Sequence, residues 1–501
     1  MTATTSSTSS VNGRRRQTSG HWIALGAAVW IVGCAHRGSV THDLVILGGR
    51  VIDPESGSDS IRNVGISNGA VAALTSDAIQ GRDTITAGGL VVAPGFIDLH
   101  AHGQDEENRR YQAMDGVTTA LELEIGTEDV DGWYAAQGEG SLINYGVAVG
   151  HPRVRLAIMH DPGPRLPSGD AAHRESTADE IVAIRRRVEL GLDQGAIGVG
   201  FGLQYTPGAS QWEVLELFRA AAAAHAPAFV HLRYVADREP HNSVAALEEV
   251  LTAAAITGTP LHVLHVLSTA QRGTPKLVQM IDEARARGLD VTTELFPYTA
   301  GMTRLESALF DPGWRELFEM DFNDLEWIAT GERLTATTFD RYRKMGGLTI
   351  LHYPVLTEEM LEQTLSKPFV FVSSDGRLEQ GHGHPRGAGT FARLLGRYVR
   401  ERKALSLADA IAKVSLLPAK RLEDRVPGMT RKGRVRVGAD ADLVGFDPTR
   451  VIDRATFRQP ATFSDGIQFL LVGGTPVVRS GRLVDGARPG RPVRALITKA
   501  R

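Results

Sequence analysis

The segment from Ala93 to His102 ends in two histidines that are separated by a single alanine. The residues before them are apolar and predict a short strand, in which residues two apart point to the same face. His100 and His102 therefore project side by side, with Asp98 below them. Neutral imidazole is the commonest metal-binding side chain, so this pair supplies half of a zinc site.

Three further polar residues follow apolar runs elsewhere in the chain. His231 ends the run Ala-Phe-Val, His265 follows residues 261–264, and Asp375 follows residues 369–374. A single histidine or aspartate at the end of a strand is commonly a core or capping residue. Five such residues at the ends of four different strands indicate one shared site.

The middle of the chain must position these residues, and its pattern is typical of a (β/α)8 TIM barrel. Short apolar runs alternate with amphipathic stretches, and in that fold the active site lies at the carboxyl ends of the strands. The predicted strands include residues 147–149, 196–199, 228–231, 261–265, 290–294, 348–351 and 369–372. The predicted helices include residues 178–194, 211–224, 243–257, 275–287 and 357–365.

Both ends of the chain carry short strands separated by Gly, Asn and Asp turns. We expect them to meet in one small β-sandwich, with the barrel inserted between its two parts. The expected boundaries are 43–93 and 434–494 for the sandwich and 94–433 for the barrel.

Residues 1–34 form a predicted lipoprotein signal peptide. The positive block 14–16 precedes an apolar run from 22 to 32, which is too short to span a bilayer. The run ends at Cys34, the only cysteine, and residues 31–34 resemble a bacterial lipobox. This predicts a lipid anchor in the cell envelope, and Ala35 favours the outer membrane. A plain signal anchor with an incidental cysteine is the alternative.

The net charge of −3 gives no reason to expect nucleic acid as a partner.

Several motifs resemble the amidohydrolase superfamily, and within it the N-acyl-D-amino-acid deacylase group. The resemblance covers nearly everything after residue 42. The motifs are Pro-Gly-Phe-Ile-Asp-Leu-His-Ala-His at 94–102, Gly-Val-Thr-Thr at 116–119, Gly-Leu-Gln-Tyr-Thr-Pro-Gly at 202–208, Ser-Ser-Asp-Gly at 373–376, His-Pro-Arg at 384–386 and Ala-Asp-Leu-Val-Gly-Phe-Asp-Pro at 441–448.

The resemblance implies a zinc-dependent hydrolase that cleaves a carbon–nitrogen bond of a small substrate, such as an N-acyl amino acid, a dipeptide or a related amide. It implies one or two divalent metal ions, with Asp375 as the catalytic carboxylate that moves a proton between water and the leaving nitrogen. A deaminase or an esterase/lactonase of the same superfamily is an alternative, and a non-catalytic metal-binding lipoprotein is another. The implied metal ligands are His100, His102, His231, His265 and Asp375.

This chain departs from the deacylase pattern at one expected metal ligand. The usual cysteine is absent from residues 120–126, where Glu122 and Glu124 alternate with apolar residues and share one face. Two buried carboxylates are costly unless a cation compensates them. We favour Glu124 as the bridging metal ligand because it lies nearer the carboxyl end of the strand. Glu122 is the alternative or a supporting partner.

A second departure concerns the substrate. The positions that hold the substrate carboxylate in the resembling enzymes read Leu267, Phe296 and Met302 here, and only Arg386 is retained. An arginine alone still binds a carboxylate bidentately. We therefore expect a less polar pocket in which Arg386 contacts the substrate. His384, expected on a loop over the site, and Tyr205, in a turn, are further candidates for substrate contact.

Overall fold

The computed structural model describes residues 41–498 of the chain. The predicted signal peptide and Cys34 lie outside the described residues. No helix within the described range is both long enough and apolar enough to cross a bilayer.

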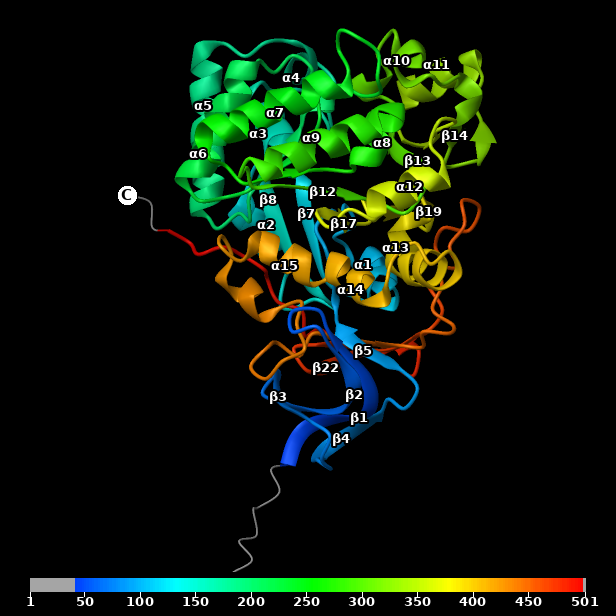
Figure 1. Ribbon diagram of the computed structural model, residues 1–501. Coiled ribbons are helices and arrows are strands. Elements are labelled where there is room, and N and C mark those ends of the chain that lie inside the picture. The colour runs from blue at the N-terminus through cyan, green and yellow to red at the C-terminus, as the bar shows by residue number, and fades with distance from the viewer. Residues whose placement is uncertain (1–40, 499–501) are drawn as a thin grey trace, which may run out of the picture. The chain divides into compact units, whose positions relative to one another are not determined.

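Eight parallel strands form a barrel within residues 41–498, which confirms the predicted fold class. The two ends of this sheet meet through loops, since the Gly103 N–H donates to Gly376 O at 3.0 Å and the Ser374 N–H donates to Asp98 Oδ1 at 3.0 Å. Figure 1 shows the barrel strands enclosed by helices. The strands are β6 (Phe96–Asp98), β7 (Val117–Thr127), β8 (Asn144–Gly150), β9 (Val199–Gly202), β10 (Ala228–His231), β11 (Leu261–Val263), β12 (Val291–Leu295) and β17 (Val370–Val372).

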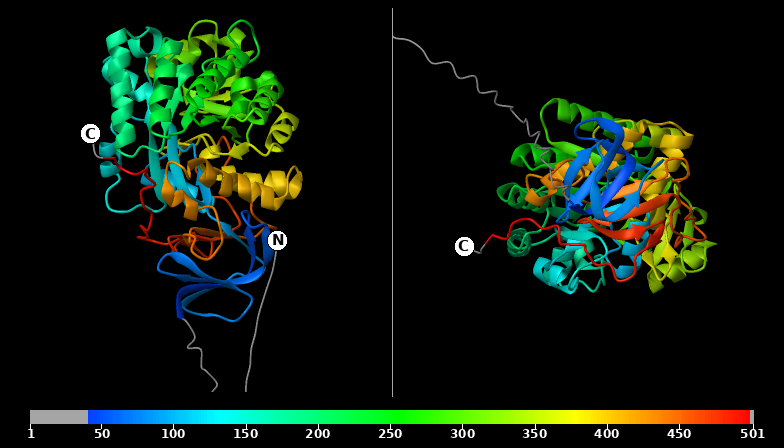
Figure 2. Two further views of the ribbon diagram at one scale, coloured as in Figure 1. Left: turned by 60° about the vertical axis from the view of Figure 1, so that its left-hand side comes forward. Right: turned by 90° about the horizontal axis from the view of Figure 1, so that it is seen from below.

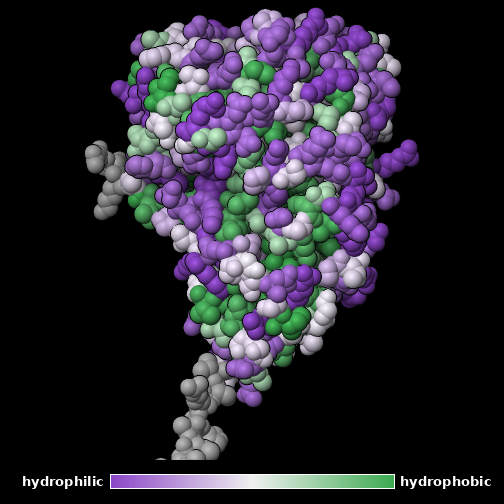
Figure 3. All heavy atoms as spheres, in the orientation of Figure 1, coloured by the Kyte–Doolittle hydropathy of each residue, from purple (hydrophilic) through white to green (hydrophobic). Residues whose placement is uncertain are grey.

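Several of the helices around the barrel begin at a side-chain cap. In α5 the Thr177 and Glu180 side chains form a capping box with the first turn. Helix α7 starts after Asn242 and stops at Gly258, which adopts a left-handed conformation with φ +74°. On the face of the molecule that Figure 3 shows, the surface over the upper helices is largely hydrophilic. The helices are α1 (Glu106–Met114), α2 (Val130–Ala136), α3 (His151–Ile158), α4 (Asp170–His173), α5 (Ala178–Asp193), α6 (Gln211–Ala223), α7 (Ser243–Thr257), α8 (Val266–Ala270), α9 (Thr274–Ala286), α12 (Glu358–Leu365), α13 (Arg386–Arg393), α14 (Leu407–Val414) and α15 (Leu416–Leu422).

An antiparallel insertion separates the last two barrel strands, and it corrects one prediction. The run 348–351 belongs to β16 (Leu348–His352), which pairs antiparallel with β13 (Ala300–Arg304) and β14 (Leu325–Trp327) rather than with the barrel. A short apolar run looks the same in either sheet, so periodicity could not distinguish them. The insertion also contains β15 (Glu332–Arg333), α10 (Trp314–Phe318) and α11 (Ala336–Met345).

The two ends of the described chain meet in a second sheet, as predicted. Strand β5 pairs with β1 from the N-terminal part and with β20 from the C-terminal part. Figure 2 shows the N-terminal (blue) and C-terminal (orange to red) strands together. Within residues 41–498 this sheet has nine strands: β1 (Thr41–Asp53), β2 (Ser58–Ser67), β3 (Ala70–Thr75), β4 (Gln80–Thr86), β5 (Val91–Pro94), β20 (Leu443–Phe446), β21 (Ile467–Val472), β22 (Thr475–Arg479) and β23 (Arg482–Leu483).

Candidate metal centre and active site

The two histidines that follow β6 lie together at the carboxyl end of the barrel. Their Nε2 atoms are 3.2 Å apart, and His100 is fully buried. Each ring has a carboxylate on its other nitrogen, because His100 Nδ1 lies 2.7 Å from Glu294 Oε1 and His102 Nδ1 lies 2.8 Å from Glu122 Oε2. These carboxylates fix the orientation of both rings, and they leave both Nε2 atoms facing the same point.

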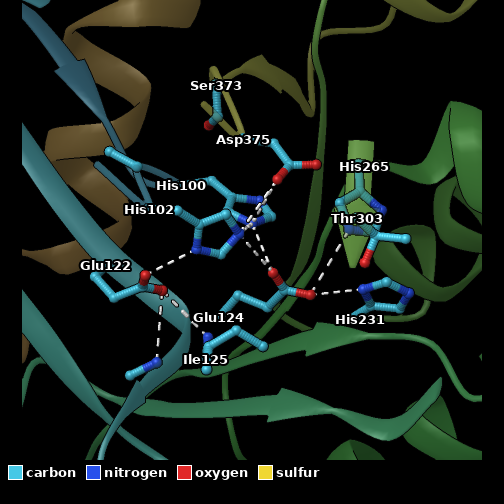
Figure 4. Close-up of polar contacts among 12 residues, drawn as sticks. His100, His102, Glu122, Glu124, Ile125, His231, His265, Thr303, Ser373 and Asp375 are labelled. Carbon is cyan, nitrogen blue, oxygen red and sulfur yellow. Dashed lines mark hydrogen bonds and ion pairs between the residues drawn. The ribbon is translucent and has the colours of Figure 1, made fainter. Parts of the chain in front are cut away.

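Glu124, on β7, lies between this pair and a second pair of histidines (Figure 4). Its Oε2 is 2.9 Å from His100 Nε2 and 3.0 Å from His102 Nε2. Its Oε1 is 2.6 Å from His231 Nδ1 and 3.9 Å from His265 Nε2. One carboxylate thus faces both pairs with different oxygens, which is the arrangement that a bridging ligand requires.

Glu122 has a different environment from Glu124. Its Oε2 contacts His102 Nδ1, while its Oε1 accepts the backbone N–H of Ile125 at 3.2 Å. Both of its oxygens are therefore engaged on the far side of the His102 ring. Glu122 therefore contacts the outer nitrogen of His102, whereas Glu124 lies between the four imidazoles.

His231 and His265 end neighbouring strands of the barrel. His231 is the last residue of β10 and its Nε2 contacts Gln204 Oε1 at 2.6 Å. His265 follows β11 and its Nδ1 contacts Thr269 Oγ1 at 3.0 Å. The other ring nitrogens, His231 Nδ1 and His265 Nε2, face Glu124.

Asp375 completes the group of side chains from the loop after β17. Its Oδ1 lies 3.2 Å from His102 Nε2 and 3.5 Å from His100 Nε2, while its Oδ2 accepts from Arg386 Nη2 at 2.9 Å. Asp375 and His265 have positive φ angles of 49° and 29°. This conformation is rare for residues other than glycine and costs on the order of 1–3 kcal/mol, and it is typical of functional sites.

Three residues that support these side chains were not predicted from the sequence. Glu294, on β12, contacts His100 with one oxygen, and its other oxygen lies 3.2 Å from His262 Nε2 and accepts from Ser373 Oγ. Glu294 follows two threonines in the strand Val-Thr-Thr-Glu-Leu, so it lacks the apolar neighbours that drew attention to Glu122 and Glu124. Gln204 and His262 carry no comparable signal.

The electrostatics of the cluster fit a bound cation. Burial opposes the charged form of His102, but Glu122 and the other carboxylates raise its pKa to about 10. Burial also opposes the charged form of Glu124, yet His100, His102 and His231 hold its pKa well below the usual range. Protons on imidazoles therefore balance the buried carboxylates here, and a divalent cation would take over that role.

The donor set supports the same conclusion. Two groups each present ligand atoms within 4.8 Å of one another, and both groups share Glu124. Imidazole nitrogens and carboxylate oxygens are suitable ligands for zinc. The groups are His100, His102, Glu124 and Asp375, and Glu124, His231 and His265.

A cavity opens onto these residues and contains two of the three predicted substrate contacts. Tyr205 and Arg386 line it, together with Phe296 and Met302. Its empty space is about 860 Å³, the open mouth included. Arg386 is almost completely buried, and its guanidinium lies 4.3 Å from the centre of the Phe296 ring. The expected less polar wall is therefore present beside Arg386.

The structure places His384 differently from the expectation. It is fully buried and does not line the cavity. Its Nε2 donates to Ala300 O at 3.0 Å, and its Nδ1 accepts the backbone N–H of Arg386 at 3.0 Å. His384 therefore contacts the backbone of Arg386, the first residue of α13, and does not face the cavity.

Comparison with known proteins agrees with this geometry. Residues 231–478 match the model of the amidohydrolase family. An N-acyl-D-glutamate deacylase of Alcaligenes xylosoxydans xylosoxydans is 32% identical over 90% of this chain and 96% of its own length. A D-aminoacylase of the same organism is 29% identical over 87% of this chain and 94% of its own.

A solved structure shares both the fold and its extent. The crystal structure of N-acyl-D-glutamate deacylase from Bordetella bronchiseptica, complexed with zinc and a phosphonate mimic of the tetrahedral intermediate, is 29% identical. It covers 91% of this chain and 100% of its own, with a TM-score of 0.77. These likenesses and the histidine–carboxylate cluster at the mouth of the barrel show that the chain belongs to the amidohydrolase family.

Proposed function

We propose that this chain is a zinc-dependent deacylase that hydrolyses the carbon–nitrogen bond of an N-acyl amino acid, a dipeptide or a related small amide. The observation that carries the proposal is the position of Glu124 between two histidine pairs, with Asp375 Oδ1 3.2 Å from His102 Nε2. The similar N-acyl-D-glutamate deacylase and D-aminoacylase support it, as does the zinc in the similar solved structure.

The two donor groups that share Glu124 would hold one or two zinc ions. His100, His102, Glu124 and Asp375 would hold one, and Glu124, His231 and His265 would hold the other. When bound, zinc supplies a water whose pKa is lowered to about 7 and polarises the substrate carbonyl. Glu122, Glu294, Gln204 and Thr269 keep the four imidazoles in place for this purpose.

Asp375 is the residue placed to move the proton. Burial opposes its charged form, but Arg386 and the nearby histidines hold its pKa below the usual range, so Asp375 is a carboxylate at neutral pH. A carboxylate there accepts the proton of the attacking water. It then donates that proton to the amide nitrogen, which leaves poorly as an anion. Arg386 fixes Oδ2 and leaves Oδ1 toward the reacting centre.

A substrate panel tests the proposed reaction. Purified, zinc-loaded protein is offered both enantiomers of several N-acetyl amino acids, dipeptides and lactones, and release of amine or acid is followed. We expect hydrolysis of at least one N-acyl amino acid or dipeptide, which a chelator abolishes and zinc restores. Hydrolysis of lactones alone would place the chain among esterases, and zinc binding without any turnover would indicate a non-catalytic protein.

We also propose that Cys34 carries a lipid anchor that holds the protein in the bacterial cell envelope. The support is the order of a charged segment, a short apolar run and a lipobox-like end within residues 1–34. Expressed in a bacterium, the full chain should fractionate with membranes and incorporate labelled palmitate. A Cys34→Ala variant should do neither, and an unchanged distribution would contradict the anchor.

A further inference from the structure

Two arginines from separate loops converge on one backbone oxygen in the wall of the catalytic cavity. Arg165 lies between α3 and α4, and Arg377 follows β17. Arg165 Nη2 lies 3.5 Å and Arg377 Nη1 lies 3.4 Å from the carbonyl oxygen of His102. Both side chains line the cavity and are partly exposed, by 35% and 24%. They are therefore accessible to a bound substrate.

The loop that carries Arg165 is held firmly in place. Asp161 accepts the backbone N–H groups of Gly163, Ser168, Gly169 and Ala171 at 2.8–3.0 Å. Arg153 also donates to the carbonyl oxygen of Arg165 at 3.3 Å. These hydrogen bonds fix the position of Arg165, and a side chain that binds a ligand needs such support.

Each arginine has one acidic neighbour, and each keeps further N–H groups for another partner. Glu122 lies 3.5 Å from Arg165 Nη2, but its oxygens are already engaged by the His102 ring and the Ile125 N–H. Glu379 contacts Arg377 through Nε at 2.7 Å, which leaves Nη1 directed at His102. Beyond these acidic neighbours, the two arginines share only the neutral carbonyl oxygen of His102, at 3.4–3.5 Å.

A carboxylate is the natural third partner for two such groups. Its two oxygens accept from both guanidinium groups, and its charge removes the repulsion between them. The carbonyl that both arginines contact belongs to His102, whose ring lies 3.2 Å from Asp375. An anion bound by the pair would therefore lie beside the reacting centre. Arg386 is a third cation in the cavity, and it is already paired with Asp375 Oδ2.

We propose that Arg165 and Arg377 form a carboxylate-binding subsite, and that the amide substrate carries an acidic group there. The substrate class is then the N-acyl derivatives of dicarboxylic amino acids. This inference rests on the proposed deacylase function, because the subsite selects among amides that Asp375 helps to cleave.

The test compares two ligands that differ only in charge. Binding of N-acetyl-glutamate and N-acetyl-glutamine, each as both enantiomers, is measured by calorimetry on the zinc-loaded Asp375→Asn protein, which suppresses turnover. We expect at least one enantiomer of the glutamate derivative to bind tenfold or more tightly than its glutamine counterpart. Adding Arg165→Gln or Arg377→Gln should reduce that preference at least fivefold.

Arg304→Gln is the matched control. Arg304 lines the same cavity and its Nε donates to Glu306, but unlike Arg165 and Arg377 it makes no hydrogen bond to the His102 carbonyl oxygen, so the preference should survive its loss. Arg377→Lys keeps the charge and should retain part of the preference. Zinc content and thermal unfolding confirm that each variant is folded.

Three results would overturn the subsite. They are no preference in the parent protein, an unchanged preference in both pair variants, or an equal loss for both ligands, which would reveal a purely structural role. Turnover by the wild-type chain reports separately on the proposed function. Charge-selective binding without hydrolysis of any amide would refute the deacylase function and leave the subsite standing.

Discussion

Exchanging Glu124 and Glu122, one at a time, for glutamine separates the bridging carboxylate from the supporting one. The two residues are both buried on β7, two positions apart. Glutamine keeps the size of the side chain and removes its charge. The pair is therefore a matched comparison, in which each variant controls for the effect of losing a buried charge in the other.

The contacts predict unequal losses. Glu124 lies within 3.0 Å of three imidazole nitrogens, on His100, His102 and His231, from both donor groups. Glu122 touches only the outer nitrogen of His102 among these rings. Loss of such an outer partner typically weakens metal binding about 10- to 100-fold. Loss of Glu124, which serves both groups directly, should exceed about 100-fold, or about 3 kcal/mol.

Competition with a chromophoric zinc chelator measures these affinities, and elemental analysis gives the number of ions bound. We expect Glu124→Gln to lose at least one ion at chelator concentrations that Glu122→Gln withstands. Circular dichroism verifies that both variants are folded. The reasoning is refuted if Glu122→Gln loses zinc more readily than Glu124→Gln, because the bridge would then be the other carboxylate.

Three further predictions follow from the structure. Asp375→Asn should lower kcat by about 10²–10⁴-fold, while His100, His102 and Glu124 still hold the zinc and its content stays the same. Turnover that is retained, as measured by amine release, would show that Asp375 takes no part in the reaction. Glu213 accepts from Arg155 at 2.6 Å and contacts His151 at 2.8 Å, and all three side chains are fully buried. Glu213→Gln should therefore lower the free energy of unfolding by about 3–5 kcal/mol, as measured by denaturant titration. A loss under about 1 kcal/mol would contradict this prediction. Burial lowers the pKa of Lys413 to about 8, so between that value and the usual pKa of about 10.4 the unfolded chain binds more protons than the folded chain. Wild-type stability should therefore rise relative to Lys413→Met from pH 8 to pH 10, by about 1.4 kcal/mol for each unit of pKa difference, and a constant difference would be inconsistent with that shift.

The parts of the site that could be predicted are those with a local signature. The His-x-His spacing placed His100 and His102 on one face of one strand, and charge within an apolar strand drew attention to Glu122 and Glu124. The structure brings these residues together with His231, His265 and Asp375. Each of these residues follows from a pattern within a few positions of itself.

The remaining features depend on contacts that are distant in sequence. Gln204 reaches His231 across 27 positions and Glu294 reaches His100 across 194, so no local pattern reveals either role. Residues 348–351 form a strand as predicted, but their sheet is set by pairing with β13 and β14. His384 accepts the backbone N–H of Arg386 at the start of α13. The spacing of the His-Pro-Arg motif does not show this contact.

An anomalous difference map from a zinc-loaded crystal tests the central claim most directly. The account predicts zinc density at one or both positions beside Glu124, one among His100, His102 and Asp375 and the other between His231 and His265. Zinc density only elsewhere in the molecule, or none at these side chains at saturating zinc, would contradict it.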